Sequence, residues 1–509
     1  MNKPSPREGA TLETGLIYRD GTTKEPISQV DVNKLPGITL YEKKCLLINR
    51  EIDAMGMGRY QWVVWGLCGF GYLIDLLWAQ AFGLALSPLQ QEFGFGSGQT
   101  GNITVAFSAG LTAGAFVWGV LADTIGRRWS FNFTVLFASV FGLALGASGS
   151  YTTFLVLTAF VGFGIGGNVP IDTTIALEFI PQNKRYLLAL LSIFQPLGVV
   201  ICSAIAFGFI PNRSCSPNFS EANPLPSCFK EGLEPGAPCC SRESNMGWRY
   251  FLYTLGAITL FVLFLRSAVF RLKESPKYLI CKGRDAEAVA VVQHISKKNG
   301  IPCNLTLEHL KQLTSEEDSM DTSSTMVNPG AYLPQILALK NGAASVSLKF
   351  TYGSYIYTYA PGIVGVLLGS FMYRVPSIGR KWTMTIASGL MAASIFLFAV
   401  VDTVPKNLGL FTMEYFFQSM FNAVLYGWTP EAFPAPVRGS ACGLASFWGR
   451  LFGIVSPLIA QNLYASSKTG DDQTVGGNIN AVLYLAGGIT LGCVITTALL
   501  PNKMRVMTD

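Results

Sequence analysis

The chain has 509 residues, of which half are hydrophobic and only 13% are charged, and its formal net charge is +6. Soluble domains carry about 25% charged residues, so this composition excludes an ordinary soluble protein and indicates a membrane protein. The positive excess requires no nucleic-acid partner, because cytoplasmic loops of membrane proteins are rich in lysine and arginine.

The chain divides into a polar arm, two helical blocks and a loop between them. Residues 1–60 are polar and charged without a sustained apolar period, which predicts a disordered cytoplasmic arm. We expect helix bundles over 61–270 and 331–500, a central cytoplasmic loop over 271–330 and a cytoplasmic tail over 501–509. Eleven apolar segments approach the length that a membrane helix needs, at about 61–86, 101–122, 129–149, 151–177, 186–210, 248–270, 351–373, 383–403, 408–428, 439–463 and 477–500.

Two motifs recur at one constant spacing. Gly126, Arg127 and Arg128 close the segment GVLADTIGRRW, and Gly379, Arg380 and Lys381 repeat this ending 253 residues later. The pattern E-x-x-P-x-x-x-R recurs with the same shift, first as Glu178, Pro181 and Arg185 and then as Glu431, Pro434 and Arg438. A constant shift in two independent motifs indicates a duplicated unit, with six helices expected in each half.

The second half lacks one clear helix. The duplication requires a seventh helix before residue 351, but only 331–339 is continuously apolar there, apart from Gln335. Nine residues span about 13 Å as a helix, less than half of a hydrocarbon core of about 30 Å. Helix seven is therefore either truncated or broken, and the sequence favours truncation. Before it, 286–295 has the spacing of an amphipathic helix and 314–327 has the composition of a flexible linker.

Charge and cysteine content predict the orientation. Lysine and arginine concentrate in loops on the side of the N-terminus, whereas 87–100 contains neither, which places that loop on the exterior. The loop at 211–247 lies on the same exterior side and carries glycosylation sequons at Asn212 and Asn218. It also contains Cys215, Cys228, Cys239 and Cys240, which predict one or two disulfides whose connectivity stays open.

The first motif loop resembles the signature of the major facilitator superfamily, G-x-L-a-D-x-x-G-R-[RK]. The matching residues are Gly119, Leu121, Ala122, Asp123, Gly126, Arg127 and Arg128. ESPKYL and TPEAFPAPVRG resemble its sugar porters, whereas GFGYLID and GFGIGGNVPIDTTIALEFIP resemble its metabolite:proton symporters and synaptic-vesicle-transporter-like members, as seen in fungi. The resemblance implies an all-α polytopic fold of two pseudo-symmetric six-helix bundles, alternating access to a central site, and no prosthetic group.

Two carboxylates lie inside apolar segments, Asp75 in the first and Asp172 in the fourth. A charge at mid-bilayer is costly and usually functional, and burial favours the protonated form of a carboxyl group. Both residues are therefore candidates for proton coupling, with hydrogen bonding to neighbouring helices as the alternative. The repeat places Leu425 at the position equivalent to Asp172, so the scaffold itself does not require that carboxylate.

Charged residues at the cytoplasmic helix ends predict a gate. We expect inter-helix ion pairs there that lock the outward-facing state, with a static structural bridge as the alternative. The predicted gate residues are Gly119, Asp123, Gly126, Arg127, Arg128, Glu178, Arg185, Gly379, Arg380, Glu431 and Arg438. Pro376 occupies the position equivalent to Asp123, so the gate is expected to be unequal in the two halves.

Polar and aromatic residues at membrane depth are candidates for substrate contact. They are Trp78, Gln195, Asn422, Trp448 and Arg450. Arg450 is the most telling, because a buried guanidinium can pair with a substrate carboxylate, although it can equally pair with Glu414 or a carbonyl group. The string of glycines over 162–167 is expected to serve close helix packing rather than phosphate binding.

These features favour a secondary active transporter over an enzyme. We expect a monomer in the lipid bilayer that moves a small polar or anionic metabolite, such as an organic acid, vitamin or sugar, together with protons. The plasma membrane is the expected location, and a vacuolar or vesicular membrane is the alternative. Two other functions stay open. A proton-independent sugar facilitator would tolerate Asp75→Asn, and the short helix seven favours a non-transporting sensor or scaffold.

Overall fold

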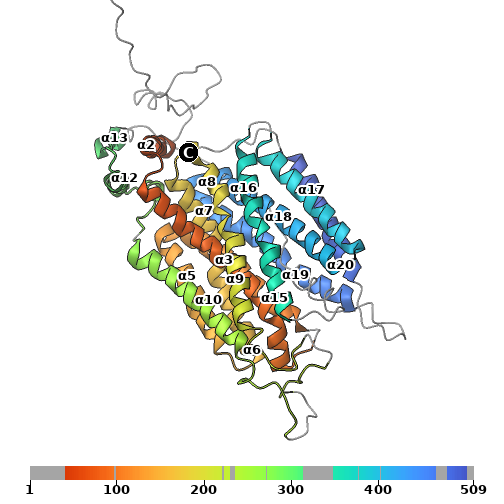
Figure 1. Ribbon diagram of the computed structural model, residues 1–509. Helices are drawn as coiled ribbons and strands as arrows, with labels where there is room; N and C mark the ends of the chain where they lie inside the picture. Colours follow the sequence, from red (N-terminus) through yellow and green to blue (C-terminus); the bar gives the residue numbers. More distant parts are fainter. Residues whose placement is uncertain are drawn as a thin grey trace, which may run out of the picture.

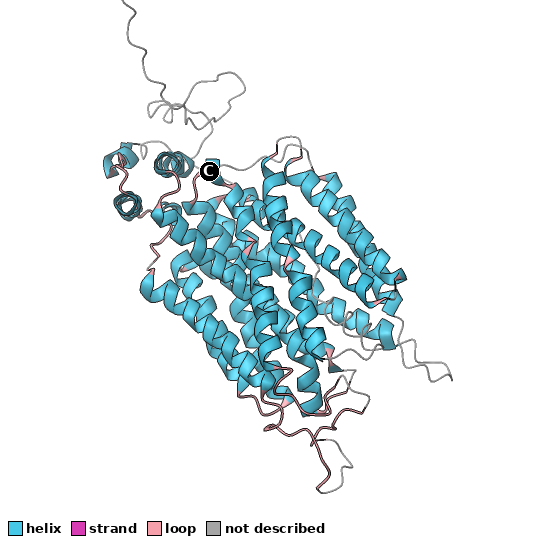
Figure 2. Ribbon diagram, viewed as in Figure 1, coloured by secondary structure: helices cyan, strands magenta, loops and turns pink. Residues whose placement is uncertain are grey.

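The computed structural model describes residues 40–96, 99–219, 223–229, 236–270, 272–312, 348–375, 378–401, 403–465 and 479–500. Helices make up the regular structure of these residues, and the β-type pairing found among them is an isolated bridge between Ser227 and Cys240 (Figure 2). The expected all-helical fold is confirmed.

The first half forms six membrane-length helical segments. Its helices are α3 (Arg59–Phe93), α4 (Gly101–Thr124), α5 (Arg127–Gly146), α6 (Tyr151–Gly166), α7 (Asn168–Phe179), α8 (Tyr186–Leu191), α9 (Phe194–Phe209) and α10 (Gly247–Phe264). The pairs α6–α7 and α8–α9 each form one segment, over Tyr151–Phe179 and Tyr186–Phe209. A π-helical turn, Leu265–Val269, extends α10.

The second half contributes the remaining five expected segments. Its helices are α15 (Leu348–Tyr359), α16 (Pro361–Arg374), α17 (Gly379–Val400), α18 (Val404–Trp428), α19 (Arg438–Ala465) and α20 (Ile479–Leu499), with the short turns η4 (Thr429–Ala432) and η5 (Ala435–Val437) before α19. By length and composition, nine segments of the described chain suit a membrane span. All eleven apolar segments predicted from the sequence thus form helices. The expected short helix at 331–339 lies outside the described residues, as do 1–39, 314–327 and 501–509.

The two halves repeat the same packing arrangement. In the first half α4 packs on α6 and α5 on α10, and in the second α16 packs on α18 and α17 on α20. The halves meet where α4 packs on α19 and where α9 packs on α15. Figure 1 shows the first half, from red to green, beside the second half in blue shades. This arrangement confirms the duplication inferred from the motifs.

Glycines permit close contact between α4 and α6. A Cβ atom at Gly162 would clash with the backbone of Phe107, and one at Gly166 would clash with the backbone of Leu111. Only glycine therefore allows the two backbones to approach this closely. The expectation that these glycines serve helix packing is confirmed.

Short helices cover one end of the bundle. They are α2 (Leu40–Met55), α11 (Pro276–Cys281), α12 (Asp285–Asn299) and α13 (Leu307–Gln312), and Figure 1 shows α2, α12 and α13 grouped beyond the membrane-length helices. Lys44 of α2 pairs with Asp285 at 2.5 Å. The expected helix at 286–295 is confirmed as α12. Following the charge distribution, we name this end the cytoplasmic end.

The prediction of a disordered arm up to residue 60 is wrong for its last third. Residues 40–55 form α2, because Leu47, Ile48 and Ile52 supply an apolar face that is buried against the helices of the central loop. The basic and acidic side chains between these residues concealed that face in the sequence. Partners that arrive from a distant part of the chain can thus order a segment with a weak apolar pattern.

Candidate functional site

Charged residues at the cytoplasmic ends of α4, α5, α7 and α19 form a buried cluster. Arg127 lies 3.1 Å from Glu178 and 3.5 Å from Asp123. Arg438, which begins α19, lies 3.7 Å from Glu178. The Asp123 carboxylate accepts hydrogen bonds from the backbone N–H and the hydroxyl of Ser440, at 2.7 and 2.8 Å. Because α19 belongs to the second half, the contacts of Arg438 and Ser440 join the two halves at this end.

The equivalent cluster of the second half has different partners. Glu431 pairs with Arg380 at 2.5 Å and accepts a hydrogen bond from the Tyr373 hydroxyl at 2.9 Å. Arg185 of the first half lies close enough to Glu431 to interact with it electrostatically. Pro376, the counterpart of Asp123, lies outside the described residues. Ion pairs thus form among the predicted gate residues, with Glu178 paired to Arg127 and Arg438 and Glu431 paired to Arg380. The links across the halves come from tertiary packing that motif spacing does not encode.

The backbones of the two halves touch beside this cluster. A Cβ atom at Gly119 of α4 would lie 2.9 Å from the carbonyl oxygen of Gly439 and 2.9 Å from Cα of Gly443. A side chain at this position would therefore push α4 and α19 apart. The first glycine of the motif is required by this close approach.

A carboxylate that the sequence analysis did not select caps α5. Glu274 accepts the backbone N–H groups of Arg127 at 3.0 Å and Arg128 at 3.2 Å, which satisfies donors at the helix N-terminus. Burial raises the pKa of the Glu274 carboxyl, and the hydrogen bond from the Ser275 backbone opposes that shift. Gly126 has a φ of +111° and makes room for the carboxylate, because a Cβ atom there would lie 2.5 Å from it. The ESPKYL motif was the available signal, but it does not identify the helix that is capped.

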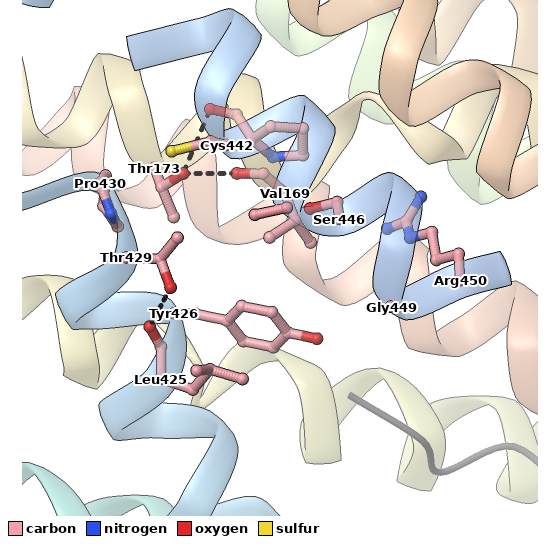
Figure 3. Close-up of a pocket in the computed structure, with 12 residues that line it drawn as sticks. Val169, Thr173, Leu425, Tyr426, Thr429, Pro430, Cys442, Ser446, Gly449 and Arg450 are labelled. Atoms are coloured by element: carbon pink, nitrogen blue, oxygen red, sulfur yellow. Dashed lines mark hydrogen bonds between the residues drawn. The ribbon is translucent and has the colours of Figure 1, made fainter. Parts of the chain in front are cut away.

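Two cavities lie along the interface between the halves. The larger, of ≈ 250 Å³, is lined mainly by α3, α4, α15, α18 and α19, and the smaller, of ≈ 90 Å³, lies between α7, α18 and α19. Tyr426, Gly449 and Arg450 line both cavities and form the wall between them, and Figure 3 shows them around the smaller one. Pro430 also lines the smaller cavity and accepts a hydrogen bond from Arg438 at 2.9 Å, so this cavity adjoins the cytoplasmic cluster.

An ion pair between the halves lies in this wall. Asp75 of α3 lines the larger cavity, and its carboxylate lies 3.7 Å from the guanidinium of Arg450. Arg450 also donates hydrogen bonds to the carbonyl oxygens of Leu111, at 3.2 Å, and Gly166, at 2.7 Å. Of the alternatives open for Arg450, the carbonyl contact is therefore present. Asn422 lines the same cavity, so three predicted site residues meet here.

Three of the predicted substrate residues line neither cavity. Trp78 is fully buried and donates from its indole nitrogen to the Thr259 hydroxyl at 3.0 Å. Gln195 is buried and hydrogen-bonds to the Tyr426 side chain behind the cavity wall. Trp448 lies on an exposed face of α19. These residues are therefore removed from the candidate substrate site, since a helix places only one of its faces toward a cavity.

Asp172 is fully buried and also lies outside both cavities. Its carboxylate pairs with Arg266 at 3.0 Å, and Arg266 donates further hydrogen bonds to the carbonyl oxygens of Leu67 and Phe131, both at 3.0 Å. Sequence reasoning missed Arg266. Its position at the end of an apolar segment was the available signal, because a charge there requires a partner.

A second buried ion pair, also missed in the sequence, fixes the opposite end of the first half. Arg249 of α10 pairs with Glu92 of α3 at 2.8 Å, and the indole nitrogen of Trp248 donates to the same carboxylate at 2.9 Å. Trp248 and Arg249 are each separated from Glu92 by more than 150 residues in the sequence, so neither contact is visible in local spacing.

The predicted disulfides both form in the loop between α9 and α10. They join Cys215 to Cys240 and Cys228 to Cys239, with Cα–Cα distances of 5.7 and 5.0 Å, which resolves the connectivity. Asn212 is exposed and Asn218 is half-buried. This loop lies at the end opposite α2 and α12, as expected for the exterior side (Figure 1).

Comparisons with known proteins agree with this architecture. Residues 87–367 match the family model described as sugar (and other) transporter. The MFS siderochrome iron transporter 1 of Ceriporiopsis subvermispora is 35% identical and is covered over 92% of both chains. The niacin transporter NiaP of Acinetobacter baylyi is 25% identical, over 82% of this chain and 90% of that protein. The structure of the proton:xylose symporter XylE aligns with a TM-score of 0.63 at 14% identity, over 87% of this chain and 97% of that chain.

The structural likeness to XylE shows the fold. The family match extends over more than half of the chain. The chain belongs to the sugar (and other) transporter family of the major facilitator superfamily, and it is an integral multi-pass membrane protein that acts as a secondary transporter of small molecules rather than as an enzyme.

Proposed function

We propose that the protein couples protons to the transport of a small metabolite that bears a carboxylate. The observation that carries the proposal is the ion pair between Asp75 and Arg450, which joins the halves in the wall between the two cavities. Charges at this depth are costly, and a pair in which substrate can replace one partner provides a function for both. The name of the niacin transporter NiaP supports this class, because niacin is a small carboxylic acid.

Protonation of Asp75 removes the negative partner of Arg450. The guanidinium can then hold a substrate carboxylate in the larger cavity, where its paired N–H donors suit the two carboxylate oxygens. A proton without substrate, or substrate without a proton, leaves an uncompensated charge in this wall, which is unfavourable. Proton and substrate therefore bind together and are released together.

The cytoplasmic cluster supplies the gate in this proposal. Opening toward the cytoplasm requires breaking the contacts of Arg438 with Glu178 and of Ser440 with Asp123, because both join the two halves. Their presence, with the larger cavity on the other side of Arg450, supports an arrangement closed to the cytoplasm. Rocking of the two halves then breaks these contacts and exposes the site to the cytoplasm.

Proton coupling is assigned here to Asp75 and not to Asp172. The buried pair of Asp172 with Arg266, outside both cavities, favours a static role. We place the monomer in the plasma membrane. The two exterior disulfides and the exposed Asn212 support a membrane reached through the oxidising secretory pathway.

The test uses the full chain in proteoliposomes, with nicotinate, benzoate and xylose as labelled probes. We expect a pH gradient, acid outside, to drive accumulation of a carboxylate probe. D75N should lower accumulation to the level of protein-free liposomes, into which the neutral acid diffuses, while retaining protein-dependent exchange of labelled for unlabelled probe. Accumulation that persists in D75N would contradict the coupling role of Asp75. Transport of xylose alone, without dependence on pH, would instead support a sugar facilitator.

A further inference from the structure

A second carboxylate, which the proposed coupling does not use, faces the larger cavity. Glu414 of α18 lines this cavity and is only 3% exposed. Among the described residues, its carboxylate has no hydrogen-bonding or ion-pairing partner. It lies close enough to the tyrosines Tyr359 and Tyr415 to interact with them electrostatically. A buried carboxylate without a counter-charge is costly, so its retention requires an explanation.

The cations near this cavity do not provide that explanation. Arg450 is taken by Asp75 and by two backbone carbonyl groups. The duplicated scaffold does not require an acid at this place either, because the residue 253 positions before Glu414 is Val161, which is fully buried in the first half. The carboxylate is thus specific to the cavity and is available to a molecule inside it.

We infer that Glu414 binds a proton-bearing nitrogen of the substrate, such as an ammonium group or a protonated ring nitrogen. The inference rests on the proposed function, in which Arg450 holds the carboxylate of the same molecule. The substrate class is then a small compound with an acidic group and a basic nitrogen. The rings of Phe82, Phe107 and Phe411 in the cavity lining provide apolar contact for the body between the two groups.

The experiment measures binding to the purified full chain with three matched probes. These are 4-(aminomethyl)benzoate, which carries both groups, 4-methylbenzoate, which lacks the nitrogen, and benzylamine, which lacks the carboxylate. We expect the first to bind at least about tenfold more tightly than 4-methylbenzoate, since a hydrogen bond between charged groups contributes on this scale. E414Q should remove this preference without weakening the binding of 4-methylbenzoate.

The variants separate this inference from the proposed function. R450A should weaken 4-methylbenzoate and leave benzylamine unchanged. If R450A has no effect but the E414Q result is as expected, the proposed function fails and Glu414 stands as a cation site. Equal affinities of the two benzoates for the wild-type protein, or a preference that survives in E414Q, would overturn the inference. The wild-type ratio decides even if E414Q does not fold, and absence of binding by all three probes contradicts both proposals.

Discussion

Equivalent helices of the two halves differ in what covers them. With the repeat shift of 253 residues, one face of α19 corresponds to one face of α8 and α9. The residues of the first face are Leu444, Trp448, Phe452, Val455 and Ile459, and they are 39–54% exposed within the described structure. Their counterparts are Leu191, Gln195, Val199, Cys202 and Ala206, which are all buried.

The face of α8 and α9 is buried against helices of both halves, because α3 and α15 pack on α9 and α18 packs on α8. The same shift places the counterpart of α3 at 312–346, and residues 313–347 lie outside the described structure. The duplication is therefore preserved in the other five segments of the second half. The described asymmetry concentrates on this face of α19 and at the charged residues of the interior.

The largest expected effect on stability comes from changing the buried pair of Asp172 and Arg266 in the first half. R266M leaves the fully buried Asp172 without its partner and should destabilise the protein by about 3–5 kcal/mol. D172L/R266M introduces the leucine that the second half carries at Leu425, and it should recover most of that loss, because an apolar pair removes both buried charges. Thermal unfolding of the detergent-solubilised variants measures both changes.

The double variant also tests the role of Asp172. It should retain pH-driven uptake of the carboxylate probe at a rate within about threefold of wild type, a difference below 1 kcal/mol. A stable D172L/R266M protein that has lost proton coupling would show that Asp172 carries protons.

A smaller effect distinguishes the repeated glycines at the starts of α5 and α17. G126A should destabilise the protein more than G379A, although the two residues occupy equivalent motif positions. Gly379 has a φ of +57° and open space around its Cβ position, so alanine costs about 1–2 kcal/mol there. Gly126 has φ +111° and ψ +155°, a region essentially restricted to glycine, and its Cβ would also meet Glu274. Equal losses in melting temperature would contradict this explanation of the motif.

The gate glutamates Glu178 and Glu431 should also differ, with the larger effect on gate opening in the first half. E178Q loses an ion pair between the halves, to Arg438. The ion pair lost in E431Q, to Arg380, lies within the second half, and the cross-half interaction of Glu431 with Arg185 is electrostatic only. We expect E178Q to shift the balance toward the inward-open state by about 1 kcal/mol, or about fivefold. Cys442 lines the smaller cavity beside the gate and reports opening through its reaction with an impermeant maleimide from the cytoplasmic side.

The labelling requires two controls. The exposed Cys281 and the half-buried Cys303 are first changed to serine, and C442S should then abolish the remaining signal. Labelling that rises equally in E178Q and E431Q would contradict the assignment of the cross-half link to Glu178.

The smallest effect concerns the exposed face of α19 and leaves stability nearly unchanged. In the background without Cys281, W448C should react with a lipid-soluble maleimide, whereas its repeat counterpart Q195C should be protected because position 195 is buried. Equal protection of the two thiols would mean that another part of the protein covers the α19 face.

The sequence predicted the elements whose causes are local. Apolar length placed all eleven helices, and the motif shift placed the gate charges and the two halves. It could not select partners that arrive from distant segments. Arg266 reaches Asp172 across 94 positions and Glu274 reaches Arg127 across 147, so neither contact has a local signature.

Helix orientation was the second limit of the sequence. Trp78, Gln195 and Trp448 have suitable chemistry and depth, but they line neither cavity. Arg450 and Asn422, in contrast, lie on helix faces that line the larger cavity. Glu414 appeared in the sequence as a partner for Arg450, and the structure instead pairs Arg450 with Asp75.

The most direct test of the central claim is to detect protons that move with the substrate. Proteoliposomes containing the full chain and an entrapped pH-sensitive dye are placed in unbuffered medium with nicotinate and benzoate, without an imposed pH gradient. We predict acidification of the interior that begins with addition of a transported carboxylate, exceeds the passive acidification of protein-free liposomes, and falls to that passive level in D75N. Uptake of the labelled carboxylate by the wild-type protein without any internal acidification would contradict proton coupling through Asp75 and Arg450.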